Sequence, residues 1–93
     1  MVEMNGGRLQ VSGPMTIESA ASLMAEGERV VRAGATVIDL SAVEDADSSA
    51  LAVLFGWLRA AGDKAGGLSI VEAPAGLRSL AVLYGVSELL PLA

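Results

Sequence analysis

The sequence predicts an α/β domain with a mostly parallel or mixed four-stranded sheet and helices packed on it. Segments with the pattern of strands and segments with the pattern of helices alternate along the chain, as they do where crossover helices join parallel strands. The 93 residues suit one compact domain, so we expect a single domain over residues 1–93. The chain is 53% hydrophobic but only 3% aromatic, which predicts a core of aliphatic side chains.

Each element follows from a local pattern. Apolar and polar residues alternate over residues 8–12, which predicts a strand, and we expect the residues before it to add an edge strand. The β-branched, apolar residues 36–40 predict a central strand, and residues 68–72 predict another. Helices are expected over residues 16–33, 48–61 and 75–84, with a last helical turn at 86–90 and loops at the glycines between them.

Composition excludes several function classes. The net charge is −5 and the six basic residues are scattered, whereas nucleic-acid binding needs clustered Lys and Arg. The chain has no Cys and no His, so it cannot build a Ser–His triad or a Cys/His zinc site. The longest apolar run, Ala50 to Leu58, is about half of a membrane-spanning helix, and the first residues show no secretory signal. The absence of cysteine is compatible with a reducing cytoplasm, and the resemblance described below implies a cytoplasmic protein.

The stretch TVIDLSAVEDADSSAL, Thr36 to Leu51, is the most informative in the chain. It predicts a buried strand, an acidic turn and a helix that starts near Ser48. The first N–H groups of a helix lack internal partners, and the helix dipole is positive there. Asp47 and Ser48 could simply cap the helix. Alternatively, Ser48 is a phosphate acceptor or a partner contact, and a phosphate there would be repelled by the nearby carboxylates.

The second helix is apolar on two sides. Leu51, Leu54 and Leu58 recur at helical spacing and predict the face that packs on the sheet. Val53 and Trp57 belong to a second apolar stripe, which either contacts a partner protein or packs against the first helix of the chain. The carboxylates of the acidic turn could in principle bind a cation, but the sequence contains no phosphate-cradling glycine motif.

Val37 to Leu54, VIDLSAVEDADSSALAVL, resembles the signature of STAS domains, the family of anti-sigma-factor antagonists and of the cytoplasmic ends of sulfate transporters. In that family a strand ending in D-L-S leads to D-S/T-x-G-L at a helix head. Asp47, Ser48 and Leu51 match this pattern, and Ala50 replaces the usual glycine. The resemblance implies a STAS fold over the whole chain, with Ser48 at the position that is phosphorylated in anti-sigma antagonists.

The end of the chain, LRSLAVLYGVSELLPLA from Leu77, resembles the MlaB subgroup. This subgroup is the small STAS subunit of the bacterial ABC complex that moves phospholipids to maintain outer-membrane lipid asymmetry. The resemblance implies a non-enzymatic protein without catalytic residues, metal or cofactor, which binds an MlaF-like ATPase and lies at the inner membrane only through its complex. The expected contact residues are Asp45, Asp47, Ser48, Ser49, Ala52, Val53, Gly56 and Trp57.

The alternative is an anti-sigma-factor antagonist that is switched by phosphorylation at Ser48, with an anti-sigma factor kinase as its partner. Such antagonists usually carry G-E-L-D-x-x-T after the first strand, where this chain has Gly13-Pro14-Met15-Thr16. That departure favours the transporter subunit over the antagonist.

Overall fold

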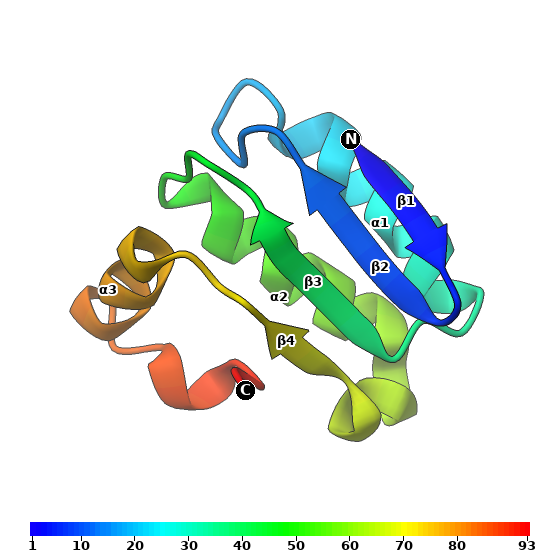
Figure 1. Ribbon diagram of the computed structural model, residues 1–93. Coiled ribbons are helices and arrows are strands. Elements are labelled where there is room, and N and C mark those ends of the chain that lie inside the picture. The colour runs from blue at the N-terminus through cyan, green and yellow to red at the C-terminus, as the bar shows by residue number, and fades with distance from the viewer.

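The computed structural model describes the backbone of residues 1–93 and every side chain except that of Ala65. One four-stranded sheet has the order β1-β2-β3-β4 (Figure 1). The edge strand β1 is antiparallel to β2, whereas β2, β3 and β4 are parallel. The expected mixed four-stranded α/β fold is therefore confirmed. The strands and helices are β1 (Val2–Asn5), β2 (Arg8–Ser12), α1 (Ala20–Arg32), β3 (Val37–Ala42), α2 (Ser49–Ala61), β4 (Ser69–Val71) and α3 (Ala75–Leu83).

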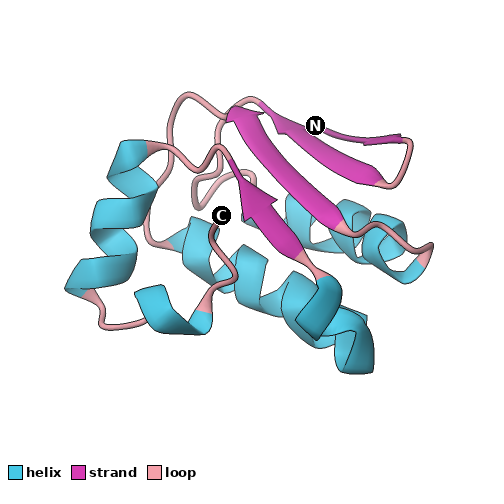
Figure 2. Ribbon diagram, turned by 60° about the horizontal axis from the view of Figure 1, so that its bottom comes forward, coloured by secondary structure: helices cyan, strands magenta, loops and turns pink.

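Helices α1 and α2 cover one face of the sheet, and the other face is open (Figures 1 and 2). Successive side chains of a strand point to opposite faces, so alternate residues of β2, β3 and β4 enter the core beneath the helices. These inward side chains are fully buried: Leu9, Val11, Ile38, Leu40 and Ile70. Residues between them, such as Gln10 and Asp39, face outward. This alternation is the pattern from which the strands were predicted.

The first and the last residues of the chain lie at the two opposite edges of the sheet. Gly6 and Gly7 have positive φ, as a two-residue hairpin turn requires, and they join the predicted edge strand β1 to β2. At the other edge the N–H of Ile70 donates to the carbonyl of Pro91 at 2.9 Å, and the N–H of Ala93 donates to the carbonyl of Ile70 at 2.9 Å. The last residues thus lie beside β4 and cover its exposed edge.

Helices α1 and α2 pack closely because each has a glycine where the other has a large side chain. Trp57 of α2 lies against Gly27 of α1, and Met24 of α1 lies against Gly56 of α2. The Trp57 side chain is fully buried, and its indole N–H donates to the carbonyls of Leu23 at 3.1 Å and Met24 at 3.3 Å. The second apolar stripe of α2 is therefore covered by the first helix of the chain itself.

The start of α1 is the largest error in the predicted elements, since the helix begins at Ala20 and not at residue 16. The N–H of Thr16 donates to Ser19 Oγ at 3.0 Å, and that hydroxyl donates to the carbonyl of Pro14 at 2.8 Å. A side chain that bonds nearby backbone groups competes with helical bonding, so residues 16–19 form a turn. The predicted loop after α2 contains a 3₁₀ helix, Gly62–Gly67, and a second one spans Ser87–Leu89.

None of the helices that the structure describes has the length and apolar character needed to cross a membrane.

Candidate functional site

The loops that follow β2 and β3 lie side by side at the carboxyl end of the sheet. The N–H of Met15 donates to the carbonyl of Asp45 at 2.8 Å, and the N–H of Asp47 donates to the carbonyl of Met15 at 3.2 Å. Met15 and Ala46 form an isolated parallel bridge. Because the Met15 side chain is buried in the core, this bridge fixes both loops to the body of the domain.

Asp47 joins the two loops to the head of α2. One carboxylate oxygen, Oδ1, accepts from the N–H of Ser49 at 2.8 Å, and the other, Oδ2, accepts from the N–H of Ile17 at 3.1 Å. Ser48 already has helical backbone angles, with φ of −62° and ψ of −19°, so Asp47 occupies the position of a capping residue. Of the two readings of this motif, capping is confirmed for Asp47.

These bonds keep Asp47 ionised. Desolvation raises the pKa of its carboxyl group, but hydrogen bonds from the backbone N–H groups of Ser49 and Ile17 lower it by more. The net result is a pKa below the ordinary aspartate value. Both loops are thus held by a negative charge at the positive end of a helix.

The Ser48 side chain does not cap the helix. It is exposed and makes no capping hydrogen bond, because Asp47 performs that task. Ala52 lies one turn further along α2 and is also exposed, while Ser49 is half-buried. Asp45 is exposed in the preceding turn. Five of the expected contact residues therefore gather around one helix head: Asp45, Asp47, Ser48, Ser49 and Ala52.

The other three expected contact residues do not line this surface. Val53 and Trp57 are 1% and 0% exposed, and Gly56 is buried. All three belong to the face of α2 that packs on α1, which the two interhelical glycine contacts hold close. The expectation that Val53, Gly56 and Trp57 contact a partner is wrong for this surface, and the reading in which Trp57 packs against the first helix is correct.

Ile17 was missed as a surface residue by the sequence analysis. The helix predicted over residues 16–33 includes it, but it precedes α1 and is 70% exposed. The hydrogen bond to Asp47 fixes its backbone within the same loop cluster as Ser48. Ser19 is the feature of the sequence that could have indicated the later helix start. Serine favours caps and turns, and Ser19 lies three positions after Thr16.

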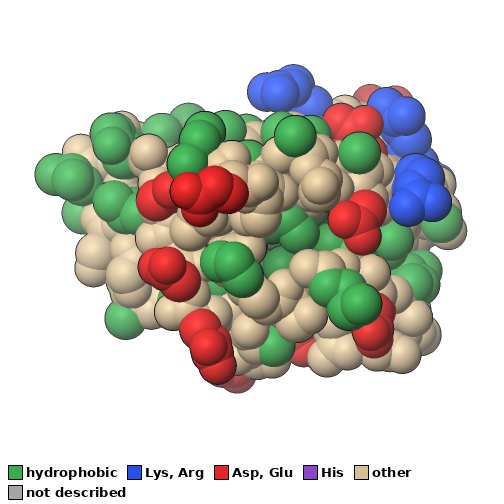
Figure 3. Space-filling model, turned by 90° about the horizontal axis from the view of Figure 1, so that it is seen from above, with side chains coloured by type: hydrophobic (Ala, Val, Ile, Leu, Met, Phe, Trp, Pro, Cys, Tyr) green, Lys and Arg blue, Asp and Glu red, His purple; other side chains and the backbone are tan. Residues whose placement is uncertain are grey.

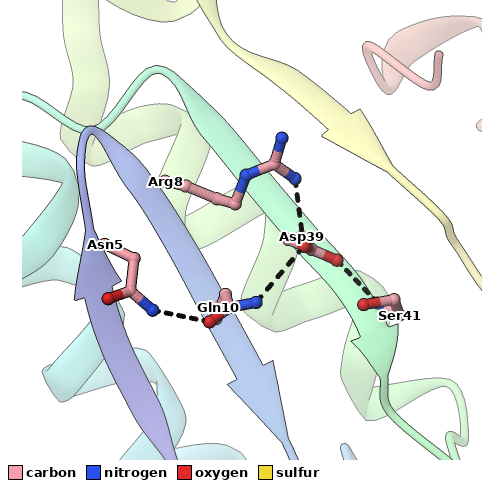
Figure 4. A network of polar contacts seen from close by, with 5 residues as sticks. All are labelled: Asn5, Arg8, Gln10, Asp39 and Ser41. Atoms are coloured by element: carbon pink, nitrogen blue, oxygen red, sulfur yellow. Dashed lines mark hydrogen bonds and ion pairs between the residues drawn. The ribbon is translucent and has the colours of Figure 1, made fainter.

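A separate polar network lies on the open face of the sheet (Figure 4). Asp39 Oδ2 accepts from Arg8 at 3.0 Å and from Gln10 at 3.5 Å, while Oδ1 accepts from the N–H of Ser41 at 2.9 Å. Asn5 donates to Gln10 at 2.7 Å. The bonds from Ser41, with smaller contributions from Arg8 and Gln10, outweigh desolvation and lower the pKa of Asp39. This network ties β1, β2 and β3 together across the strands.

Across the residues that the structure describes, no group of three or more Asp, Glu, His or Cys side chains is arranged to hold a metal ion.

The fold and the helix head together define a small α/β domain of STAS type: an apolar strand, an acidic turn, and a helix capped by aspartate with an exposed hydroxyl beside the cap. The model of one family, described as "Mlab, STAS domain", matches residues 2–91. The chain belongs to the STAS domain family and is of the MlaB type. No curated protein sequence matches it significantly.

Solved structures with the same fold include two that are described as anti-sigma factor antagonists, one of them putative, and a Bacillus cell fate determinant. An anti-sigma factor antagonist from Mycobacterium paratuberculosis is 30% identical with a TM-score of 0.79, over 99% of this chain and 81% of that chain. A putative anti-sigma factor antagonist from Thermotoga maritima is 17% identical with a TM-score of 0.72, over 99% and 83%. The Bacillus cell fate determinant SpoIIAA in its phosphorylated form is 18% identical with a TM-score of 0.65, over 100% and 89%.

Proposed function

We propose that this chain is a non-enzymatic subunit of an ABC transporter that moves phospholipids to maintain outer-membrane lipid asymmetry. It binds the ATPase subunit on the cytoplasmic side and supports its assembly and activity. The observation that carries the proposal is the match of the MlaB-type family model over residues 2–91. The exposed residues at the head of α2 are the proposed contact, with Ser48 and Ala52 at its centre.

The geometry of this helix head supports a binding role. Asp47 caps the helix through its own carboxylate, so the Ser48 hydroxyl remains available to a partner. The loops beside it are fixed by the bridge between Met15 and Ala46. A rigid, preformed surface loses little conformational entropy on association, which suits a subunit that remains in its complex.

Affinity purification tests this proposal. A tagged chain expressed in its native cells is expected to co-purify with an ABC ATPase and its membrane permease, and mass spectrometry is expected to find Ser48 unmodified. Ser48→Tyr places a bulky ring on the proposed contact without touching the core, and it should lose both partners. Retention of the ATPase by the folded Ser48→Tyr protein would contradict the assignment of the contact surface.

A second candidate is the anti-sigma-factor antagonist switched at Ser48. The observation that favours it is the likeness to the mycobacterial antagonist at 30% identity, together with the exposed Ser48 hydroxyl. A phosphate on Ser48 would lie at a helix N-terminus but beside Asp45 and Asp47. Incubation with the cognate kinase and ATP should then add one phosphate to Ser48, and a Ser48→Ala protein should accept none. No transfer to the wild-type chain would remove this candidate.

A further inference from the structure

We propose that Ile17 is the apolar anchor of the partner site, and that the partner presents an apolar pocket rimmed by Lys or Arg. The inference rests on the proposed function, because it takes the ATPase subunit as the partner, and it adds the chemistry of the contact. Neither Ile17 nor the charge of the partner surface follows from the signature at the head of α2.

Ile17 is exposed at a fixed position and not on a loose loop. Its side chain is 70% exposed, while its backbone N–H is held by Asp47 Oδ2 at 3.1 Å. Two residues earlier, Met15 is buried and bridges to the β3–α2 loop. An exposed aliphatic side chain on a fixed backbone suits a central anchor, which fills a pocket of the partner and is surrounded by a polar rim.

The surroundings of Ile17 are acidic. The loops that follow β2, β3 and β4 contain no Lys or Arg, and their acidic residues are Glu18, Glu44, Asp45, Asp47 and Glu72. Most of the basic residues belong to the opposite end of the strands, where β2 begins and where α1 and α2 end: Arg8, Arg29, Arg32, Arg59 and Lys64. Figure 3 shows the Lys and Arg side chains in view gathered at one end of that face, whereas Asp and Glu side chains lie both beside them and across the rest of the face.

This separation of charge selects the partner. An acidic rim attracts a basic surface and repels an acidic one, so it sets orientation and the rate of association. The exposed Ile17 within that rim requires an apolar recess on the same partner surface. The domain therefore docks with the carboxyl ends of its parallel strands toward the partner, and with the opposite, basic end of the strands away from it.

A second exposed apolar patch provides the matched control. Exposed apolar side chains lie at the end of α3 and in the 3₁₀ helix that follows it: Val82, Leu83, Tyr84 and Leu89, of which Leu83 is 76% exposed. Leu83→Ser and Ile17→Ser remove similar apolar side chains from similarly exposed positions. Likewise, Asp45→Lys and Asp63→Lys make the same change in charge, the first in the acidic rim and the second beyond the end of α2.

The test is a titration of purified ATPase subunit with the wild-type chain and the four variants, at two salt concentrations. We expect Ile17→Ser to weaken binding at least about tenfold and Leu83→Ser to leave it unchanged. Asp45→Lys should weaken binding and remove most of its salt dependence, whereas Asp63→Lys should do neither. Circular dichroism and thermal unfolding of each variant exclude a loss of fold.

Two results separate the inference from the proposed function. If the wild-type chain binds the ATPase and Ile17→Ser binds equally well, or if Leu83→Ser is the variant that fails, the inference is overturned and the proposed function stands. If the wild-type chain binds an anti-sigma kinase in place of the ATPase, and Ile17→Ser and Asp45→Lys both weaken that complex, the proposed function fails and with it the ATPase as the partner, while the contact through Ile17 and the acidic rim stands.

Discussion

Trp57 of α2 lies directly over Gly27 of α1, and a Cβ atom at Gly27 would overlap the indole ring. The ring is fully buried, and its N–H bonds to the carbonyls of Leu23 and Met24. This contact closes the second apolar side of α2. The buried residues of α2, such as Trp57, therefore maintain the fold, whereas Ser48 and Ala52 remain exposed at the head of the helix.

Gly27→Ala should therefore destabilise the domain. Alanine is favoured over glycine in a helix by about 1 kcal/mol, but overpacking a full core typically costs about 1–3 kcal/mol, and a buried ring has little room to shift. We expect a net loss in the free energy of unfolding, measured with urea. Gly76→Ala in α3 is the control, because a Cβ there meets no atom within 4 Å. It should leave stability unchanged or raise it, and equal effects of the two substitutions would contradict the packing.

Trp57→Asp should unfold the chain. The substitution removes a large buried side chain, which costs about 3–5 kcal/mol, and leaves a carboxylate without a partner in an apolar site. The free energy of unfolding of native domains is only about 5–15 kcal/mol, so the two losses together should exceed the stability of a small domain. Since Trp57 is the sole tryptophan, circular dichroism must report folding of the variant. A folded Trp57→Asp protein that merely lost its partner would restore the original partner-contact reading of this residue.

The hydrogen bonds that Asp39 accepts from Ser41, together with its ion pair to Arg8, should make the free energy of unfolding depend on pH in the acid range. The pKa of Asp39 is lower in the folded chain than its ordinary value, so its contribution is present above about pH 4 and is lost as pH falls through the folded pKa. The Arg8 side chain is 45% exposed, so solvent weakens the pair. Asp39→Asn should lower the free energy of unfolding at neutral pH. The difference in this free energy between the variant and the wild type should become smaller toward pH 2.

The hydrogen bond that the N–H of Ile17 donates to Asp47 should be visible in hydrogen exchange. With Asp47→Ala both carboxylate bonds are lost, so the amides of Ile17 and Ser49 should exchange faster than in wild type. Asp47→Asn retains a side-chain oxygen that can cap α2, so in this variant the amide of Ser49 should remain better protected from exchange than the amide of Ile17. NMR measures both amides separately. Unchanged exchange at Ile17 in the alanine variant would show that Asp47 does not position this loop.

The sequence predicted the architecture because the strands and α2 are strongly patterned. The alternation of Leu9 and Val11 with polar residues, and the apolar run at Ile38 and Leu40, correspond to the buried face of the sheet. The helix head at Asp47 was identified because Asp and Ser are typical of caps. These features depend on the spacing of residues that are close along the chain, and this spacing can be read from a single sequence.

The errors arise where tertiary contacts decide the outcome. Periodicity could not show which of two apolar stripes of α2 faces α1, because that depends on Gly27 lying opposite Trp57. Nor could it show that Ser19 bonds to Thr16 and Pro14 and delays the start of α1. The exposure of Ile17 follows from that delay, and so a residue of the candidate site was assigned to a helix.

The most direct test of the account is ATP hydrolysis by the ABC complex, reconstituted with and without this chain. We expect the chain to bind the ATPase subunit saturably and to raise the rate of hydrolysis, and Ser48→Tyr to abolish both effects while remaining folded. The account would be contradicted if the folded wild-type chain neither bound the ATPase nor changed its rate, and instead accepted phosphate on Ser48 from an anti-sigma kinase.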